Sequence, residues 1–400
     1  MDRTDKGSTV RRNALSRWWR GRARHGLISL FMWLGMLVVL VLMAARMVPS
    51  SHSAGRVIPE LVAFVPFAVL PTLVVVLLST FWHRRILAVL SALCLVTLVV
   101  WHIGYFVPRH TLSDTARSAT STSSETAPNT DDRVLRLMTL NTLNGHVSAS
   151  KVVDIVRTQK VELLALQEVS QGFLQELSDA GIHDLLPYSV LGSSGRSDNG
   201  GINVLFSATQ MSDQNTSLLP IETSAMPAGS LSIGGTTVRF VSAHPNSPHK
   251  GGQGLWSEGL TTIAKLANYS HSYVILGDFN ATWDHARFRE LLGSSFVDAG
   301  EQAGEGFHMT YPANSTIPPL IEIDHIVYSR DAGLYVGDLQ TISVAGSWRC
   351  SPRSRQARRG SGSGGLSPPR TFAKGSERSR RATKAISFTT EKSLQSSLDI

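Results

Sequence analysis

Three long runs without a charged residue lie near the start of the chain and constrain what it can fold into. Residues 26–45, 61–82 and 86–108 contain no Asp, Glu, Lys or Arg. Each reaches the roughly 20 residues that a helix needs to cross a ~30 Å hydrocarbon layer. The first run also fits a signal peptide, because basic residues precede it and small residues follow it. The two runs directly downstream favour retention over cleavage, so we expect a three-span transmembrane anchor over residues 26–108.

Basic residues flank these runs and predict an orientation. Residues 1–25 hold eight Lys or Arg against two acids, and residues 83–85 read His-Arg-Arg between the second and third runs. By the positive-inside rule both segments belong in the cytoplasm. We therefore expect a multi-pass protein of the cell membrane whose residues beyond 108 are extracytoplasmic. His102, near the end of the third run, is expected to reach interfacial water, and we assign it no role.

The net charge of +8 comes from the two ends of the chain. Residues 348–400 hold twelve Lys or Arg against three acids, and the 322 residues between the two basic ends sum to −7. This distribution excludes a reading of the whole chain as a nucleic-acid-binding protein from its charge alone. The two cysteines, Cys94 and Cys350, form neither a disulfide framework nor a thiolate metal cluster. Oxygen or imidazole ligands must therefore hold any metal.

The rest of the chain divides by composition into three segments. Residues 109–132 are rich in Ser and Thr and predict a flexible tether, while residues 133–347 alternate short apolar runs with amphipathic stretches, as in a mixed α/β domain. Residues 348–400 are expected to be a basic, disordered tail whose one strand-length apolar run is Ala385–Thr390. The expected strands are 134–141, 161–166, 201–207, 237–243, 273–277, 322–328 and 338–344, and the expected helices are 149–159, 170–180, 255–268 and 284–292.

Polar residues gather at the ends of these expected strands. Alone, each has an ordinary structural explanation: Glu168 as an acid at a helix start, Asp278 with Asn280 as an Asx turn, and His244 as a structural hydrogen-bonding group. Together they predict an active site at the rim of a sheet. The residues in question are Asn141, Glu168, His244, Asp278 with Asn280, and Asp324 with His325.

Five motifs occur in the order found in a known family. They are Leu-Arg-Leu-Met-Thr-Leu-Asn ending at Asn141, Leu-Gln-Glu ending at Glu168, Ser-Ala-His-Pro around His244, Gly-Asp-Phe-Asn at 277–280 and Ile-Asp-His-Ile around Asp324. Through them the chain resembles the endonuclease/exonuclease/phosphatase family of deoxyribonuclease-like, metal-dependent phosphoesterases. The resemblance implies a four-layer α/β sandwich, in which two packed β-sheets lie between outer helices, here preceded by the three transmembrane helices.

The resemblance also implies a role for each site residue. Glu168 would bind Mg²⁺, or Mn²⁺, with support from Asn141. Asp278 would position or deprotonate the attacking water, and Asn280 and His244 would stabilise the phosphoryl oxygens. In the family, the residue at the position of Asp324 holds a C-terminal histidine in the correct tautomer.

That C-terminal histidine is where the sequence departs from the family. The family ends its domain with Ser-Asp-His and a final apolar strand, whereas here Ser347 is followed by Trp348-Arg349-Cys350. One hypothesis is a reading-frame shift near codon 347, and the other is a natural basic tail. Loss of the histidine would cost about 10²–10⁴ in rate. His325 is not an obvious substitute, and His249 and His308 are candidates only by their place in nearby loops.

Two classes of function therefore stay open. The first is an extracytoplasmic, membrane-tethered phosphoesterase acting as a nuclease or phosphodiesterase on nucleic acid or on a lipid headgroup, with the bilayer as its partner and no obligate protein partner. The second is a catalytically impaired domain that binds a phosphate-containing partner.

Overall fold

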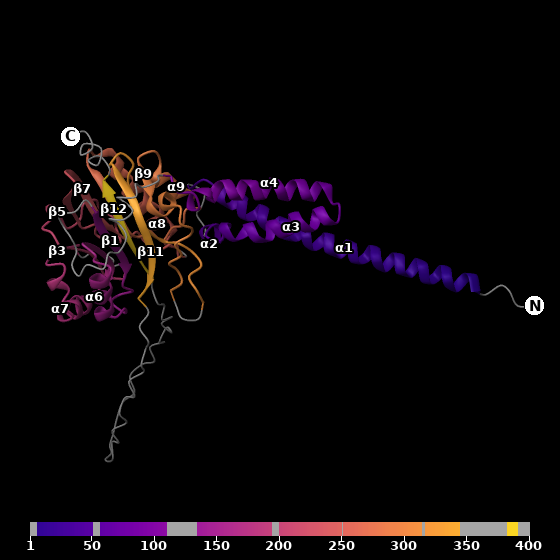
Figure 1. Ribbon diagram of the computed structural model, residues 1–400, viewed down its shortest axis with the longest axis horizontal. Coiled ribbons are helices and arrows are strands. Elements are labelled where there is room, and N and C mark those ends of the chain that lie inside the picture. Colours follow the sequence, from indigo (N-terminus) through magenta and orange to yellow (C-terminus); the bar gives the residue numbers. More distant parts are fainter. Residues whose placement is uncertain are drawn as a thin grey trace, which may run out of the picture.

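A computed structural model describes residues 6–50, 57–109, 134–193, 200–249, 251–313, 317–344 and 382–390. The expected tether beyond Arg109, Ser347 and most of the expected tail lie outside these residues. The described chain forms a helical bundle that projects from an α/β domain (Figure 1).

The bundle contains the three apolar runs and is called the N-terminal bundle below. Its helices pack around a cluster that includes Met36, Val65 and Leu98. Two stretches, Gly26–Met47 and Arg85–Tyr105, are long and apolar enough to cross a membrane, whereas the middle run forms a shorter apolar stretch, Val65–Phe81. Its elements are α1 (Lys6–Met47), α2 (Val57–Val62), the 3₁₀ helix η2 (Val65–Ala68), α3 (Val69–Phe81), α4 (Arg85–His102) and the 3₁₀ helix η3 (Ile103–Tyr105).

The α/β domain contains two six-stranded sheets. The first has the strand order β11-β12-β1-β2-β4-β3, and the second has the order β5-β6-β7-β8-β10-β9. The strands are β1 (Val134–Asn141), β2 (Leu163–Val169), β3 (Tyr188–Leu191), β4 (Ile202–Ser207), β5 (Ser212–Asn215), β6 (Ala228–Ile233), β7 (Thr236–Ala243), β8 (Ser272–Asp278), β9 (Phe296–Asp298), β10 (Asp324–Ser329), β11 (Leu334–Ser343) and β12 (Ala382–Thr390). The helices are α6 (Ala149–Thr158), α7 (Gln171–Asp179), η4 (Ile182–Asp184), α8 (Gln253–Ala264), η5 (Lys265–Asn268), α9 (Ala286–Leu292) and α10 (Ala299–Ala303).

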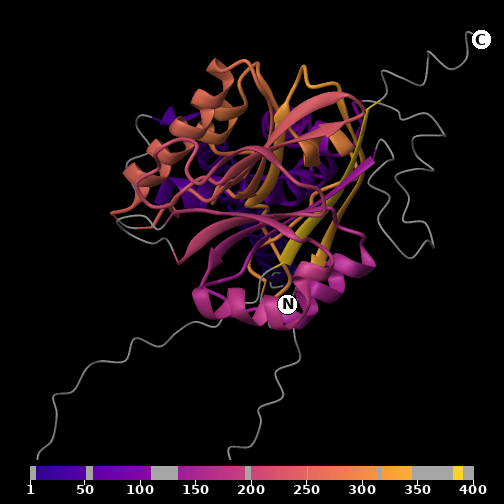
Figure 2. The same ribbon diagram turned by 90° about the vertical axis from the view of Figure 1, so that its left-hand side faces the viewer.

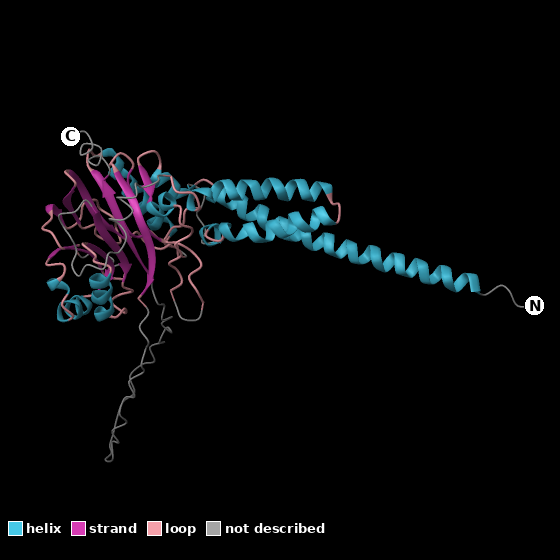
Figure 3. Ribbon diagram, in the orientation of Figure 1, coloured by secondary structure: helices cyan, strands magenta, loops and turns pink. Residues whose placement is uncertain are grey.

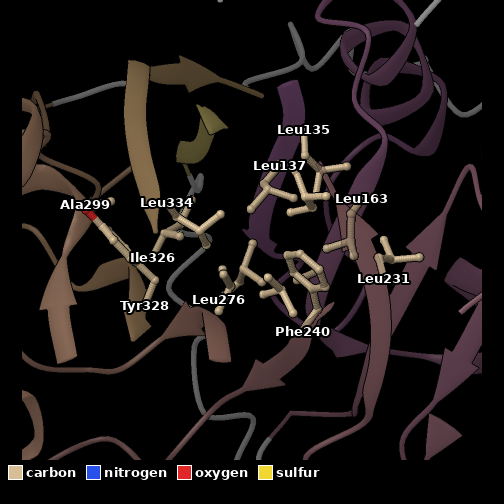
Figure 4. Packing of buried hydrophobic residues seen from close by; sticks show 14 of the residues in the cluster. Leu135, Leu137, Leu163, Leu231, Phe240, Leu276, Ala299, Ile326, Tyr328 and Leu334 are labelled. Carbon is tan, nitrogen blue, oxygen red and sulfur yellow. The ribbon is translucent and has the colours of Figure 1, made fainter. Parts of the chain in front are cut away.

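The sheets pack face to face, with helices on their outer sides (Figures 2 and 3). Alternate residues of one strand enter different cores because side chains of a strand point to opposite faces. In β1, Leu137 lies between the sheets and Met138 lies under α6 and α7. In β8, Leu276 lies between the sheets and Ile275 lies under α8 and α9. The core between the sheets is shown in Figure 4, and the arrangement agrees with the expected sandwich of two sheets flanked by helices.

The C-terminal segment contributes a strand that we did not expect from a basic tail. Strand β12 lies between β1 and β11 and is antiparallel to both. It contains Ala385–Thr390, the apolar run singled out in the sequence. The expectation that residues 348–400 form only a disordered tail is therefore wrong for residues 382–390.

The strand directions bring the ends of four strands to one edge of the sandwich. β1 runs parallel to β2 in the first sheet, and β7 runs parallel to β8 in the second. The two sheets are joined by hydrogen bonds just below this edge: Gln167 Nε2 donates to Ser242 Oγ at 3.0 Å, and Ser242 Oγ donates to the Leu166 carbonyl at 3.2 Å. These bonds fix the carboxyl ends of β2 and β7 against each other.

Candidate active site

Asn141, at the end of β1, is the centre of a polar cluster at this edge. Its Nδ2 donates to Glu168 Oε1 at 2.6 Å and to Asp278 Oδ2 at 3.0 Å, and it lies 3.5 Å from His244 Nε2. Its Oδ1 accepts a hydrogen bond from the Leu143 amide. Asn141 therefore links residues from both sheets and holds the two carboxylates close together.

Glu168 reaches the cluster through an irregularity in β2. The register between β2 and β4 shifts between Leu166 and Val169, and the φ of Glu168 is +54°. A positive φ is unfavourable for a residue with a side chain and is found at functional sites whose surroundings enforce it. The conformation also requires small neighbours, because a Cβ on Gly200 would lie 2.6 Å from Glu168 Oε2. The local backbone thus directs the Glu168 carboxylate toward Asn141.

Asp278 and Asn280 are placed by the close approach of β7 and β8. A Cβ on Gly277 would lie 1.8 Å from the Ala243 carbonyl oxygen, so only glycine fits before Asp278. Asp278 is fully buried, and its Oδ1 accepts from the amide of Asn280 at 2.9 Å. Asn280 has a φ of +50°, and its Nδ2 donates to the Pro245 carbonyl at 3.2 Å. The two residues share the cluster side of the chain, as alternation predicts.

His244 follows β7 and faces both carboxylates. Its Nε2 lies 3.7 Å from Glu168 Oε1, 4.0 Å from Asp278 Oδ2 and 3.4 Å from Asn280 Nδ2. Its backbone carbonyl accepts a hydrogen bond from Ser224 Oγ at 2.6 Å. His244 is buried, so the imidazole is held in place on the cluster.

Asp324 begins β10 and lies directly opposite Asp278 in the antiparallel pair of β8 and β10. It is buried, and its backbone N–H lies 3.3 Å from Thr310 Oγ1. His325 belongs elsewhere, because its Nε2 donates to the Ala281 carbonyl at 2.8 Å and its Nδ1 lies 3.3 Å from Asp298 Oδ1. His325 therefore does not stand in for the histidine missing from the C-terminal motif.

Two supporting residues were not predicted from the sequence. Gln167 is fully buried and accepts from Thr139 Oγ1 at 3.3 Å while it donates to Ser242. Thr142 Oγ1 donates to the carbonyl of Glu168 at 2.6 Å. The sequence held a signal for Gln167, because a polar residue inside an apolar strand becomes a buried carboxamide that needs hydrogen-bond partners.

The cluster has the donors that a divalent cation requires. Ligand atoms of Glu168, His244 and Asp278 lie within 4.8 Å of one another. Two carboxylates beside one imidazole leave an excess of negative charge, and carboxylate oxygens suit hard divalent cations. The residues present therefore fit a divalent metal.

The α/β domain also contacts the N-terminal bundle beside the site, and this interface, where Arg46 and His102 meet Asp284, is called the seam below. His102, expected to reach interfacial water, is instead buried, and its Nε2 lies 3.0 Å from Asp284 Oδ2. That expectation was wrong. Arg46 Nε donates to Asp284 Oδ1 at 2.5 Å. Burial alone would raise the pKa of Asp284, but its hydrogen bond and charge interaction with His102, together with the Arg46 guanidinium, hold that pKa below the usual value.

Comparisons with known proteins identify the family of the α/β domain. The endonuclease/exonuclease/phosphatase family model matches residues 138–348. Among solved structures, TDP2 of D. rerio complexed with single strand DNA product is 14% identical with a TM-score of 0.47, covering 65% of this chain and 100% of that chain. The mannosyl-6-phosphatase of Bacteroides thetaiotaomicron is 15% identical with a TM-score of 0.42, covering 64% of this chain and 99% of that chain. A search of curated proteins finds no match.

Proposed function

The chain belongs to the endonuclease/exonuclease/phosphatase family, and we propose that it is a membrane-anchored, extracytoplasmic, Mg²⁺-dependent phosphoesterase. The class of the enzyme, a metal-dependent hydrolase of phosphoester bonds, is that of the family. The reaction is hydrolysis of a phosphodiester bond, or alternatively of a phosphomonoester bond. The observation that carries the proposal is the convergence of Glu168, His244 and Asp278 from two sheets on one point.

The side chains of the cluster have complementary roles in hydrolysis. Asp278 accepts hydrogen bonds from Asn141 and from the Asn280 amide, which fix its carboxylate for orienting the attacking water and accepting its proton. The Nδ2 of Asn280 and Nε2 of His244 lie on the same side of the cluster and are the donors for the phosphoryl oxygens. Asp324 lies across the ladder from Asp278, at the position whose role in the family is to hold the C-terminal histidine.

Glu168 would hold the divalent ion with support from Asn141, and Asp278 and His244 lie within reach of the same point. The bound ion would polarise the phosphate and neutralise developing charge. We propose Mg²⁺ as the native ion and Mn²⁺ as a substitute, because carboxylate oxygens dominate the donor set.

The surface of the N-terminal bundle supports the membrane assignment. Only 17% of the most apolar window of Gly26–Met47 and 28% of that of Arg85–Tyr105 are buried. Phe31, Phe81 and Ile86 are 70%, 74% and 78% exposed. Large contiguous apolar surfaces of this kind mark contact with a membrane or another protein. We therefore propose that α1, α3 and α4 all lie in the bilayer, with α3 as the short middle span.

The direction of the helices supports an extracytoplasmic α/β domain. The C-terminal ends of α1 and α4 contact this domain through Arg46 and His102. The turn between α3 and α4, which carries Arg84 and Arg85, lies at the opposite end of the bundle, and α1 extends beyond it (Figure 1). Residues 6–25 and the turn at residues 83–85 thus lie on the side away from the α/β domain (Figure 1), as the positive-inside rule requires of cytoplasmic segments.

The substrate is a phosphodiester within reach of the bilayer, either a lipid headgroup or extracellular nucleic acid. The net charge of −7 over residues 26–347 argues against tight, non-specific binding of duplex DNA, which needs clustered Lys and Arg. A lipid headgroup is therefore our first choice.

The test is hydrolysis by the full-length chain in lipid nanodiscs. Labelled phospholipid, single-stranded DNA and bis(p-nitrophenyl) phosphate are each supplied with Mg²⁺, Mn²⁺ or EDTA. We expect metal-dependent turnover that Glu168→Ala and Asp278→Ala abolish. Turnover that survives either substitution, or none with any substrate, contradicts the proposal.

A second candidate function rests on the missing Asp-His pair after Ser347. Without a terminal histidine the domain would bind a phosphate-containing partner and turn it over slowly or not at all. Binding of inorganic phosphate or substrate without turnover supports this candidate. The missing pair has two possible origins, a reading-frame shift or a natural basic tail. Translation of the coding DNA around codon 347 in all three frames distinguishes them, because a frame that encodes Asp-His and an apolar strand indicates a frame shift.

A further inference from the structure

The segment that carries two of the site residues runs directly from the active site to the N-terminal bundle. Asp278 and Asn280 belong to the site, and Asp284 and His285 follow in the same segment, residues 278–285. We propose that the N-terminal bundle positions this catalytic segment, so that Arg46 and Tyr105 are positioning residues for the hydrolytic reaction. This inference rests on the proposed function and extends the site to a part of the chain outside the matched family region.

The first connection is a buried charged cluster around Asp284. Arg46, at the end of α1, donates from Nε to one carboxylate oxygen at 2.5 Å, and His102, at the end of α4, contacts the other at 3.0 Å. The opposite nitrogen of His102, Nδ1, donates to the Leu98 carbonyl at 2.8 Å. The backbone carbonyl of Arg46 also accepts a hydrogen bond from Arg289 Nη2 at 3.1 Å. One end of the catalytic segment is thus held by two helices of the bundle.

The second connection runs through His285. Its Nδ1 accepts from the Thr282 amide at 2.8 Å, so the ring hydrogen lies on Nε2, which donates to the Pro59 carbonyl of α2 at 3.0 Å. Both nitrogens of the ring are therefore used, one within the segment and one on the bundle.

The third connection reaches the middle of the segment. Tyr105, in η3 of the bundle, donates to Asp298 Oδ2 at 3.3 Å, and Asp298 Oδ1 faces His325 Nδ1 at 3.3 Å. His325 Nε2 then donates to the carbonyl of Ala281 at 2.8 Å. Ala281 immediately follows Asn280, so this series of hydrogen bonds ends one residue from a side chain of the active site.

These contacts differ from another contact between the same two parts of the protein. Arg109, just past the bundle, pairs with Glu301 of α10. That pair touches α10 and not residues 278–285, and the side chain of Arg109 is 45% exposed. Arg109→Met is therefore a matched control for Arg46→Met, because each removes one guanidinium from the seam.

The consequence is that the geometry of Asp278 and Asn280 depends on the bundle. A buried ion pair whose partner is removed leaves an uncompensated charge and favours local opening of the segment that carries it. Opening of residues 281–285 would disturb the side chains that orient water and phosphate, while the hydrogen bond from Asn141 to Glu168 would remain.

The experiment compares three full-length variants in nanodiscs: Arg46→Met, Tyr105→Phe and Arg109→Met. Hydrogen exchange is measured on peptides covering residues 279–289, and kcat and KM are measured with bis(p-nitrophenyl) phosphate and Mg²⁺. We expect Arg46→Met to speed exchange of the segment about tenfold, with a smaller effect of Tyr105→Phe, which removes one hydroxyl and keeps the ring. We expect kcat of Arg46→Met to fall about tenfold with KM within about twofold.

Arg109→Met should leave both measurements within about twofold of the wild type. Unchanged exchange in Arg46→Met and Tyr105→Phe, or equal changes in Arg109→Met, would overturn the inference. A wild-type chain without turnover would contradict the proposed function, but the exchange measurements would still judge whether the bundle holds the catalytic segment.

Discussion

Two clusters that combine carboxylates with histidine each include one residue of the segment 278–285, Asp278 in the first cluster and Asp284 in the second. The two clusters differ in charge. The cluster that we propose as catalytic, called the catalytic cluster below, consists of Glu168, His244 and Asp278, which is two carboxylates and one imidazole. The seam cluster consists of Asp284, Arg46 and His102, which is one carboxylate with two basic groups. Arg46 therefore supplies a cation inside the seam cluster, whereas we expect the proposed catalytic cluster to take one from outside.

We propose that this difference reflects a structural role for the seam cluster and a reactive role for the catalytic cluster. Buried charges are tolerated when they are paired, and a set with excess negative charge is suited to a cation. The four predictions that follow test the comparison, beginning with the largest expected effect.

Asp278→Asn should remove the function of the catalytic cluster and preserve the fold. The amide keeps the size of the side chain but cannot accept the proton of the attacking water, so kcat should fall about 10³-fold. Turnover is measured with Mg²⁺ in nanodiscs, and melting temperature serves as the control. A fall of less than about tenfold would show that Asp278 is not the base.

Asp284→Ala should have its main effect on stability. It leaves Arg46 and His102 buried without their carboxylate, which should lower the free energy of unfolding by roughly 3–5 kcal/mol. Chemical denaturation in detergent measures this loss. The comparison fails if Asp284→Ala unfolds at the same denaturant concentration as the wild type.

The seam should also weaken at acid pH because of His285. Burial lowers the pKa of His285 from 6.5 to about 4. The unfolded chain therefore binds a proton at His285 near pH 6.5, whereas the folded chain binds it only near pH 4. The free energy of unfolding keeps its full value above pH 6.5 and falls as the pH drops toward 4. The loss should be about 3 kcal/mol in total. Unfolding is followed between pH 4 and 7, and His285→Gln should remove most of the slope.

Metal binding should stabilise the chain through the catalytic cluster. Mg²⁺ at about 100 times its Kd should add about 2.7 kcal/mol to the free energy of unfolding. Glu168→Gln should abolish this gain, while Ser50→Ala, which removes an exposed contact with Glu290 at the seam, should keep it. Equal stabilisation of both variants would place the ion elsewhere.

The strands with a clear apolar run could be predicted from the sequence, and with them the rim of the site. The expected strands 134–141 and 237–243 closely match β1 and β7, because both segments are rich in apolar residues that the sandwich buries. Strand β5 was missed because Ser212–Asn215 is exposed and polar throughout. Pairing at a sheet edge, not side-chain burial, makes that segment a strand.

The meeting of the site residues followed from strand order, but the seam could not be predicted. Asn141 and Asp278 each end a strand, so their convergence needed only the fold. Arg46 and Asp284 are 238 positions apart, and no periodicity or motif connects them. His102 was misjudged for the same reason, since position near the end of an apolar run predicts contact with water unless another domain covers it.

The position of β12 sets an order of events during synthesis. Residues 382–390 form an interior strand of the first sheet, between β1 and β11. Until residues 382–390 have left the ribosome, β1 and β11 each present an unpaired edge, which invites aggregation or capture by chaperones. The helices of the bundle emerge first, whereas the sheet that carries Asn141 and Glu168 closes only after β12 has emerged. Truncation before residue 382 should therefore yield a chain that inserts normally but never completes its catalytic domain.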